Sequence, residues 1–142
     1  MCWDGVAVAG LTPEERRASR CKTVGYVRPG ATAAPGLTES QDVNLLGPYG
    51  IAALEEFQTG APESSVAIGR KRAVARALAS KPAALLMDDP TRGLSATEAE
   101  AFATVLLRVV EQRGTALVVA SQHPTMIGGV HRVVRLVRGR IS

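Results

Sequence analysis

Aromatic residues are scarce in this chain and make up 4% of its 142 residues. Surfaces that bind single-stranded nucleic acid need aromatic side chains on which bases stack, so this composition argues against a direct nucleic-acid partner. Cysteine is also scarce, and Cys2 and Cys21 lack the spacing of metal ligands. We expect both to be free thiols in a reducing cytoplasm, because disulfide frameworks belong to cysteine-rich secreted proteins.

Long apolar runs are absent as well. The longest, residues 115–120, has the length of a strand, whereas a helix needs about 18–20 apolar residues to cross a bilayer. We therefore expect no transmembrane segment, and the start of the chain lacks the pattern of a cleavable leader. A chain of this length predicts a single domain, residues 1–142.

The charge balance is mildly basic, with 17 basic and 13 acidic residues and a net charge of +4. The densest basic cluster is Arg70, Lys71 and Arg72, inside a segment with a helical pattern. We expect these residues, with Arg76, to lie on the solvated sides of that helix. A nucleic-acid patch would need aromatic partners that this chain hardly supplies.

Strand and helix signals alternate along the chain. Runs of β-type residues occur at 5–10, 23–27, 83–87, 115–120 and 132–137, and helical patterns start at Thr12 and cover 66–80 and 95–113. Thr12 with Glu15, and Ser95 with Glu98, have the spacing of capping boxes. Residues 37–63 are weakly patterned, with two helical turns expected at 51–57. This alternation predicts an α/β fold with a parallel sheet and helical crossovers.

The most informative run is Ala-Ala-Leu-Leu-Met-Asp-Asp-Pro-Thr at residues 83–91. Consecutive apolar residues predict a strand that is covered on both faces, and ligands of parallel sheets lie at the carboxyl ends of the strands. Asp88 and Asp89 end this strand, and a carboxylate there can hold Mg²⁺ against a nucleotide phosphate. The plainer alternative is a solvated turn with an incidental acidic pair.

The order of strand, Asp-Asp-Pro-Thr, capped helix, strand and a turn with His123 and Pro124 resembles the nucleotide-binding subunit of ABC transporters, of the lipoprotein-release and macrolide-export type. Residues 71–78, Lys-Arg-Ala-Val-Ala-Arg-Ala-Leu, resemble the family's Arg-Val-Ala-Ile-Ala-Arg-Ala-Leu. The resemblance implies a P-loop NTPase-like α/β fold with a mostly parallel sheet and flanking helices. It also implies that residues 37–65 are the remnant of a shortened helical subdomain.

The resemblance also assigns site residues. Asp88 stands at the Walker B aspartate, which helps hold Mg²⁺, and Asp89 stands at the catalytic glutamate with a side chain one methylene shorter. Gln122 stands at the switch histidine. His123 comes one position later, and the alternative for it is an ordinary surface-turn histidine.

Three further motif positions are changed from the family pattern. Pro29 stands at the Q-loop glutamine and has no side-chain amide to contact metal or water. Ser65 is the remnant of the signature Leu-Ser-Gly-Gly-Gln, at residues 64–68. Ser95 stands at the D-loop aspartate and is better explained as a helix cap.

Nothing in the sequence reads Gly-x-x-x-x-Gly-Lys-Ser/Thr, the loop that cradles phosphates. The chain resembles the family from after that loop, so the Walker A strand, loop and helix are expected to be lacking. Neighbours of a missing strand would expose unpaired backbone groups, which predicts a marginal or self-associating protein.

By resemblance, the cofactors are ATP and Mg²⁺, and the partners are a membrane permease and a second ABC ATPase subunit. The location implied is cytoplasmic, peripheral at the inner face of the membrane. The leading hypothesis is an ABC-type ATP-binding protein with little or no ATPase activity alone. One alternative is a non-catalytic module that pairs with an intact ABC subunit or a permease, and another is a fragment of a longer gene whose P-loop lies upstream.

Overall fold

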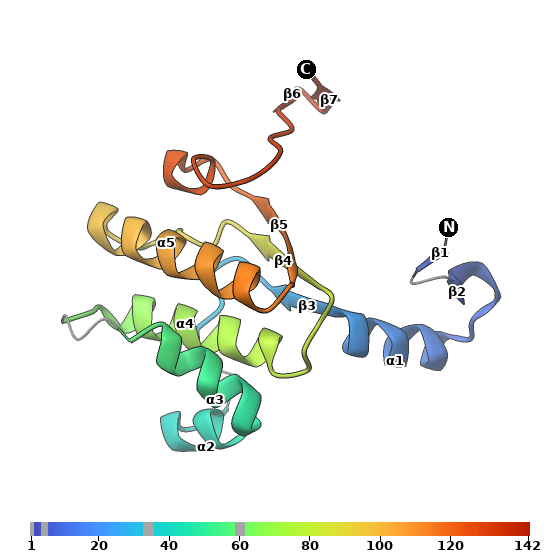
Figure 1. Cartoon of the computed structure of the whole chain (residues 1–142), viewed down its shortest axis with the longest axis horizontal. Helices are drawn as coiled ribbons and strands as arrows, with labels where there is room; N and C mark the ends of the chain where they lie inside the picture. The colour runs from blue at the N-terminus through green and yellow to red at the C-terminus, as the bar shows by residue number, and fades with distance from the viewer. Residues whose placement is uncertain (1, 4–5, 33–35, 59–61) are drawn as a thin grey trace.

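The structure is a computed structural model that describes residues 2–3, 6–32, 36–58 and 62–142. Its helices and strands alternate along the chain, as Figure 1 shows. The strands are β1 (Cys2–Trp3), β2 (Val6–Ala7), β3 (Val24–Val27), β4 (Ala84–Asp88), β5 (Ala116–Ala120), β6 (Leu136–Val137) and β7 (Arg140–Ile141). The helices are α1 (Pro13–Thr23), α2 (Glu39–Asn44), α3 (Gly47–Glu56), α4 (Ser65–Leu78) and α5 (Ala96–Gln112), with 3-10 turns η1 (Val8–Gly10) and η2 (Pro124–Met126).

The central sheet has three parallel strands in the order β3-β4-β5. Leu85 lies in register with Gly25 on one side and with Leu117 on the other. The crossovers between consecutive strands of this sheet contain α4 and α5, as the alternation of patterns predicts. The α/β fold class with a parallel sheet is therefore confirmed.

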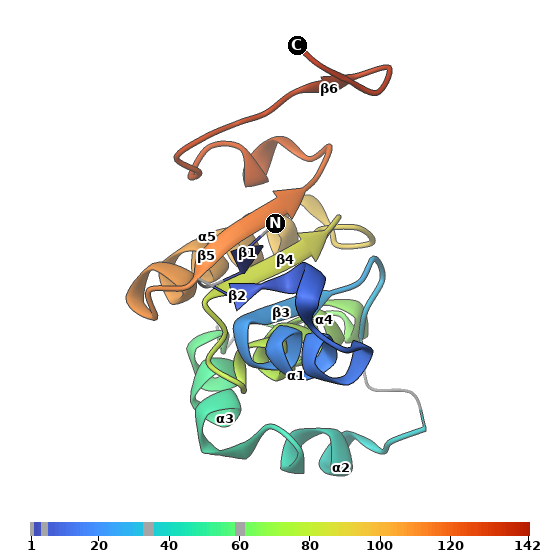
Figure 2. The ribbon, with the colours of Figure 1, turned by 90° about the vertical axis from the view of Figure 1, so that its right-hand side faces the viewer.

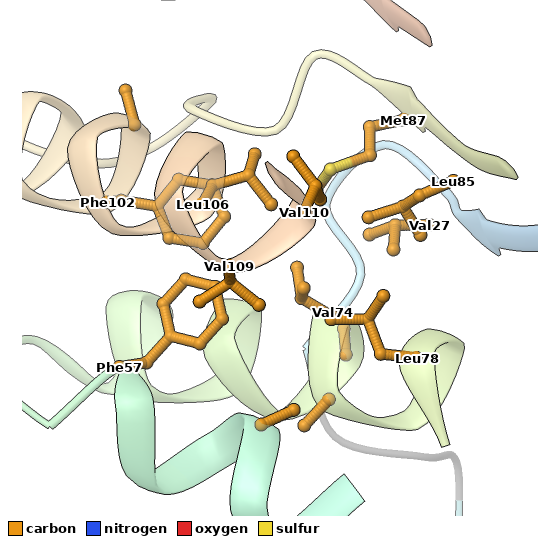
Figure 3. Close-up of a cluster of buried hydrophobic side chains, with 14 of the residues drawn as sticks. Val27, Phe57, Val74, Leu78, Leu85, Met87, Phe102, Leu106, Val109 and Val110 are labelled. Atoms are coloured by element: carbon orange, nitrogen blue, oxygen red, sulfur yellow. The ribbon is translucent and has the colours of Figure 1, made fainter. Parts of the chain in front are cut away.

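Helices α4 and α5 cover one face of this sheet, and the hydrophobic core lies between them. Leu85 and Met87 point from β4 toward Val74 of α4 and Leu106 of α5, as Figure 3 shows. Beneath them Phe57 stacks on Phe102 at 5.7 Å between ring centroids. This layer holds α4 and α5 against the sheet.

The opposite face of the sheet is open, which corrects the expectation of a strand covered on both faces. Within the described residues, side chains of Tyr26 and Val118 on that face are 57% and 59% exposed, and Leu86 between them is only partly buried. Figure 2 looks toward this side of the sheet, with α1 in front of β3. Although β4 is apolar along its length, only one of its faces is buried.

Helix starts follow the predicted capping chemistry. The hydroxyl oxygens of Thr12 and Ser95 accept from the backbone N–H groups of Glu15 and Glu98, and both capping boxes are complete. The middle of the chain is more helical than expected, because α3 starts at Gly47 and α2 precedes it. Gly50 allows α3 to approach α4, since a Cβ there would lie 3.2 Å from the carbonyl oxygen of Ala75.

The basic residues of α4 are not a solvated face, and that prediction is wrong. Arg70 is fully buried and Lys71 nearly so. The ammonium of Lys71 donates to the carbonyl oxygen of Phe57 and pairs with Glu63. Arg76 pairs with the buried carboxylate of Asp42. Lys71 and Arg76 thus fasten residues 37–63 to α4, and their charges are used inside the molecule.

In Figure 1 helix α1 with β1 and β2 lies to one side of the core, and β6 and β7 lie above it. Helix α1 has no buried residue. The expected strand at 132–137 does not join the central sheet: only Leu136–Val137 is a strand, and it pairs with Arg140–Ile141 as an antiparallel hairpin. Residue 5 of the first expected apolar run lies outside the described part, as do residues 33–35, residues 59–61 and the side chain of Cys2. Cys21 is an exposed free thiol.

Candidate functional site at the carboxyl ends of the strands

The predicted site residues gather at one edge of the sheet. Asp88 ends β4, Gln122 and His123 follow the end of β5, and Pro29 follows the end of β3. Because the three strands are parallel, their carboxyl ends meet at the same edge. We call this edge, with Asp88, Asp89, Gln122, His123 and Pro29, the strand-end site.

Asp89 is held firmly by its backbone. Its N–H donates to the carbonyl oxygen of Ala120 at 2.8 Å, and its carbonyl oxygen accepts from the N–H of Arg92 at 3.1 Å. Its φ of 45° is in the left-handed region that non-glycine residues seldom adopt. The chain therefore turns sharply after Asp88, whose side chain is exposed, while Asp89 is half-buried.

Arg70 supports this turn from below, a role that we did not anticipate. Its guanidinium donates to the carbonyl oxygens of Asp89 and Arg92, both at 3.3 Å. Burial lowers the pKa of Arg70, and the charge of Asp89 partly opposes that effect. The signal was present in the sequence, because Arg70 lies three and four positions from the apolar residues Ala67 and Val74 on the buried face of α4.

Glu98 joins the first turns of α4 and α5. One carboxylate oxygen accepts from the N–H of Ser64 at 2.8 Å, and the other accepts from the N–H and hydroxyl of Ser95 at 2.9 and 2.8 Å. Ser64 is the N-cap of α4, and the side chain of Ser65 at its first position is exposed. The capping role of Ser95 is confirmed, but its link through Glu98 to Ser64 spans 34 positions and leaves no local pattern.

The remaining residues of the strand-end site differ in exposure and in contacts. Gln122 is exposed. His123 is half-buried, and its Nδ1 lies 2.7 Å from the hydroxyl of Thr125 in the same turn. Pro29 is exposed in the turn after β3. The local contact of His123 fits the interpretation of an ordinary turn histidine.

The adjacent carboxylates at this edge are the kind of ligand that a hard cation prefers. Mg²⁺ needs only one or two protein carboxylates, which Asp88 and Asp89 can supply. The described residues contain no group of three or more His, Cys, Asp or Glu side chains able to hold a metal. The chain's three lysines lie elsewhere: Lys22 is in the last turn of α1, Lys71 is buried in α4, and Lys81 precedes β4.

The hydrogen bonds through which Glu98 joins Ser64 to Ser95 predict that the stability of the protein falls at acid pH. Hydrogen bonds from the backbone and side chains of Ser64 and Ser95 lower the pKa of Glu98 to about 2. A lowered folded-state pKa stabilises the protein above the usual value for glutamate, and this contribution is lost as the pH falls toward 2. We expect Glu98→Gln to flatten the fall in stability between about pH 4.5 and 2, as measured by urea unfolding at each pH.

Glu100→Gln is the matched control, because this exposed residue lies on the same helix. It should leave the acid limb of the stability profile unchanged. If both variants change the fall in stability at acid pH equally, the hydrogen bonds of Glu98 do not explain it.

Comparison with known proteins supports the same class. The fold is that of ABC ATP-binding cassettes. Two solved structures of the cassette MJ0796, described as dimeric and in one case bound to ADP and Pi, superpose with a TM-score of 0.76 at 22% and 21% identity. Each covers 98% of this chain, which in turn covers 69% of the MJ0796 chain.

The sequence relatives narrow the class. The lipoprotein-releasing system ATP-binding protein LolD of Bordetella pertussis is 28% identical over 98% of this chain and 68% of its own length. The macrolide export ATP-binding/permease protein MacB of Syntrophobacter fumaroxidans is 24% identical over 99% of this chain and 22% of its own length. No family model matches. The chain is a homologue of the ATP-binding proteins of ABC transporters, of the LolD and MacB type.

Proposed function

We propose that this chain is an ABC transporter ATP-binding protein with little or no ATPase activity of its own. Asp88 would bind Mg²⁺, as the family's Walker B aspartate does. Asp89, Gln122 and His123 would lie near the reacting phosphate but serve poorly there. A general base works only within hydrogen-bond reach of its water, and Asp89 has a shorter side chain on a backbone fixed from three sides.

The placement of the lysines is the observation that carries this proposal. Phosphoryl transfer depends on positioning and on positive groups around the phosphates. Lys71 is occupied by Glu63 and the carbonyl oxygen of Phe57, and Lys22 and Lys81 lie before the amino ends of β3 and β4. Ser65, Ser95 and Pro29 would add little. Pro29 has no side-chain amide, the hydroxyl of Ser95 caps α5, and Glu98 already accepts from the N–H of Ser64 beside Ser65.

A steady-state ATPase assay of the purified chain with Mg²⁺ tests the proposal. We expect no turnover above background, and Asp88→Asn should not change that rate. Turnover of about 1–100 s⁻¹, the usual range for kinases, that Asp88→Asn abolishes would contradict it. Titration calorimetry with Mg²⁺ and ADP measures binding separately from hydrolysis.

A second candidate function is pairing with an intact ABC subunit or with a membrane permease. The dimeric state in the descriptions of the MJ0796 structures favours it. LolD is named as part of a releasing system, and MacB as a combined ATP-binding and permease protein. Co-purification with the product of a neighbouring permease or ATPase gene would support this function, and a failure to associate at micromolar concentration would count against it.

Location follows from the same pairing. A permease partner would hold the chain at the inner face of the membrane as a peripheral cytoplasmic protein. None of the described helices is long and apolar enough to span a bilayer. The DNA upstream of the codon for Met1 tests the remaining alternative, because a Gly-rich, Lys-containing segment there would mean that a P-loop belongs to the same gene.

A further inference from the structure

Strand β5 is an edge strand whose outward backbone groups can be identified. The N–H of Ala116 donates to the carbonyl oxygen of Ala83, and the carbonyl oxygen of Ala120 accepts from the N–H of Asp89. Both residues therefore face β4. Because backbone groups alternate in direction along a strand, the N–H and C=O groups of Leu117 and Val119 point outward. Within the described residues no strand pairs with them.

This edge lacks the usual protection against pairing. Natural edge strands carry charged residues, proline or bulges that prevent the addition of another strand. Residues 116–120 read Ala-Leu-Val-Val-Ala and contain neither charge nor proline. The side chain of Val118 is 59% exposed beside the edge.

A second unpaired edge lies in the same chain, on the hairpin of β6 and β7. We call residues 132–142 the C-terminal arm, and every residue of it is exposed, with Leu136 and Ile141 at 70% and 77%. The N–H of Ser142 donates to the carbonyl oxygen of Arg135, so Arg135 faces β7. By the same alternation Val134 and Leu136 present their backbone groups away from β7, to the free side of the hairpin.

The outward N–H and C=O groups of the two edges can bond to each other when the strands pair antiparallel. Pairing of the outward residues places Val134 and Leu136 beside Leu117 and Val119, on the face of the sheet that packs on α5. Leu117 and Val119 already lie at the margin of the core. Arg135 then falls on the open face, where its charge stays in water.

Charge favours the same arrangement. The last acidic residue of the chain is Glu111, and the arm carries Arg132, Arg135, Arg138 and Arg140. Asp88 is exposed at the end of β4 and lies in register with Ala120 of β5. A strand added outside β5 would lie about 10 Å from β4, and the small side chain of Ala120 leaves room for an arginine on the open face to approach Asp88.

We propose that two copies of this chain form a dimer in which the C-terminal arm of each copy adds as an antiparallel strand to the β5 edge of the other. In Figures 1 and 2 the arm leads away from its own β5, so it is placed for a second molecule. Mutual exchange closes a two-fold dimer and leaves neither β5 edge open. Each contact gains backbone hydrogen bonds from an edge that is otherwise solvated.

Two proline substitutions test the two sides of the contact, the β5 edge and the C-terminal arm, separately. Val119→Pro removes an outward N–H of β5 without touching the ladder to β4, and Leu136→Pro removes an outward N–H of the arm. We expect the unaltered chain to be a dimer of twice 14.9 kDa by sedimentation equilibrium in the micromolar range. Each variant alone should be a monomer. An equimolar mixture should form a heterodimer, because one variant keeps its arm and the other keeps its edge.

Several outcomes would overturn the proposal. These are a monomeric unaltered chain, variants that still dimerise, and a mixture that stays monomeric although both variants keep the far-UV circular dichroism of the unaltered chain. If Val119→Pro does not fold, Arg135→Glu tests the contact without the mixing step, because that side chain is exposed and its reversal should raise the dissociation constant about tenfold. A tenfold rise with Arg17→Glu, a reversal on α1, would show that overall charge, and not this contact, drives the dimer. The ATPase result does not bear on any of these outcomes.

Discussion

Replacement of Arg76 by methionine is expected to lower the free energy of unfolding by about 3–5 kcal/mol, the usual cost of breaking a buried ion pair. Its guanidinium lies 2.5 and 2.6 Å from the two carboxylate oxygens of Asp42 and 2.6 Å from the carbonyl oxygen of Thr32. Asp42 is fully buried, so Arg76→Met leaves its charge without a partner inside the protein. Urea unfolding followed by circular dichroism measures the loss.

Two comparisons isolate the cause. Arg17→Met removes an exposed arginine from α1 and should change stability by no more than about 0.5 kcal/mol. The double variant Arg76→Met with Asp42→Asn should recover part of the loss, because the buried group is then neutral. A double variant as unstable as the sum of both single variants would mean that the ion pair is not responsible.

Truncation of Phe57 to alanine is expected to cost about 3–5 kcal/mol, as is usual for a buried aromatic residue. Phe57 is fully buried and stacks on Phe102, so the change opens a cavity where α3, α4 and α5 meet. Domains of this size have a total stability of about 5–15 kcal/mol. The variant should therefore lose a large part of its cooperative thermal unfolding signal in calorimetry.

Tyr26→Ala is the control for this truncation, since that ring is 57% exposed on the open face of the sheet. It should cost less than about 1 kcal/mol. Equal losses from the two changes would mean that the open face is buried in solution, for example against another molecule.

The sequence was a good guide wherever local chemistry decides the structure. The capping boxes at Thr12 and Ser95 place two helix starts correctly. In each, the hydroxyl and the glutamate three residues later bond to each other's backbone N–H group, and this pattern marks a helix start. The alternation of strand and helix signals predicts a parallel sheet with helical crossovers, and β3, β4 and β5 form such a sheet. Parallel pairing then brings Asp88, Gln122 and Pro29 to one edge without further information.

Long-range contacts were not predictable in this way. Arg76 looks like an ordinary helix-surface residue until the segment that it anchors is known, and its partner Asp42 lies 34 positions away. The strand expected at 132–137 has strong β propensity, but propensity does not say which sheet a strand joins. The Glu98 bridge to Ser64 likewise depends on how two helices meet.

The order of the strands in the sheet also has a kinetic consequence. Val24 pairs with Ala84, 60 positions later, whereas Ala84 pairs with Ala116, 32 positions later. Closing the longer loop costs about 0.6 kcal/mol more, since each doubling of loop length adds roughly that amount. The β4–α5–β5 unit should therefore form first during refolding, and β3 should dock last, which makes α1 and the N-terminal residues the latest part of the molecule to gain protection from amide hydrogen exchange.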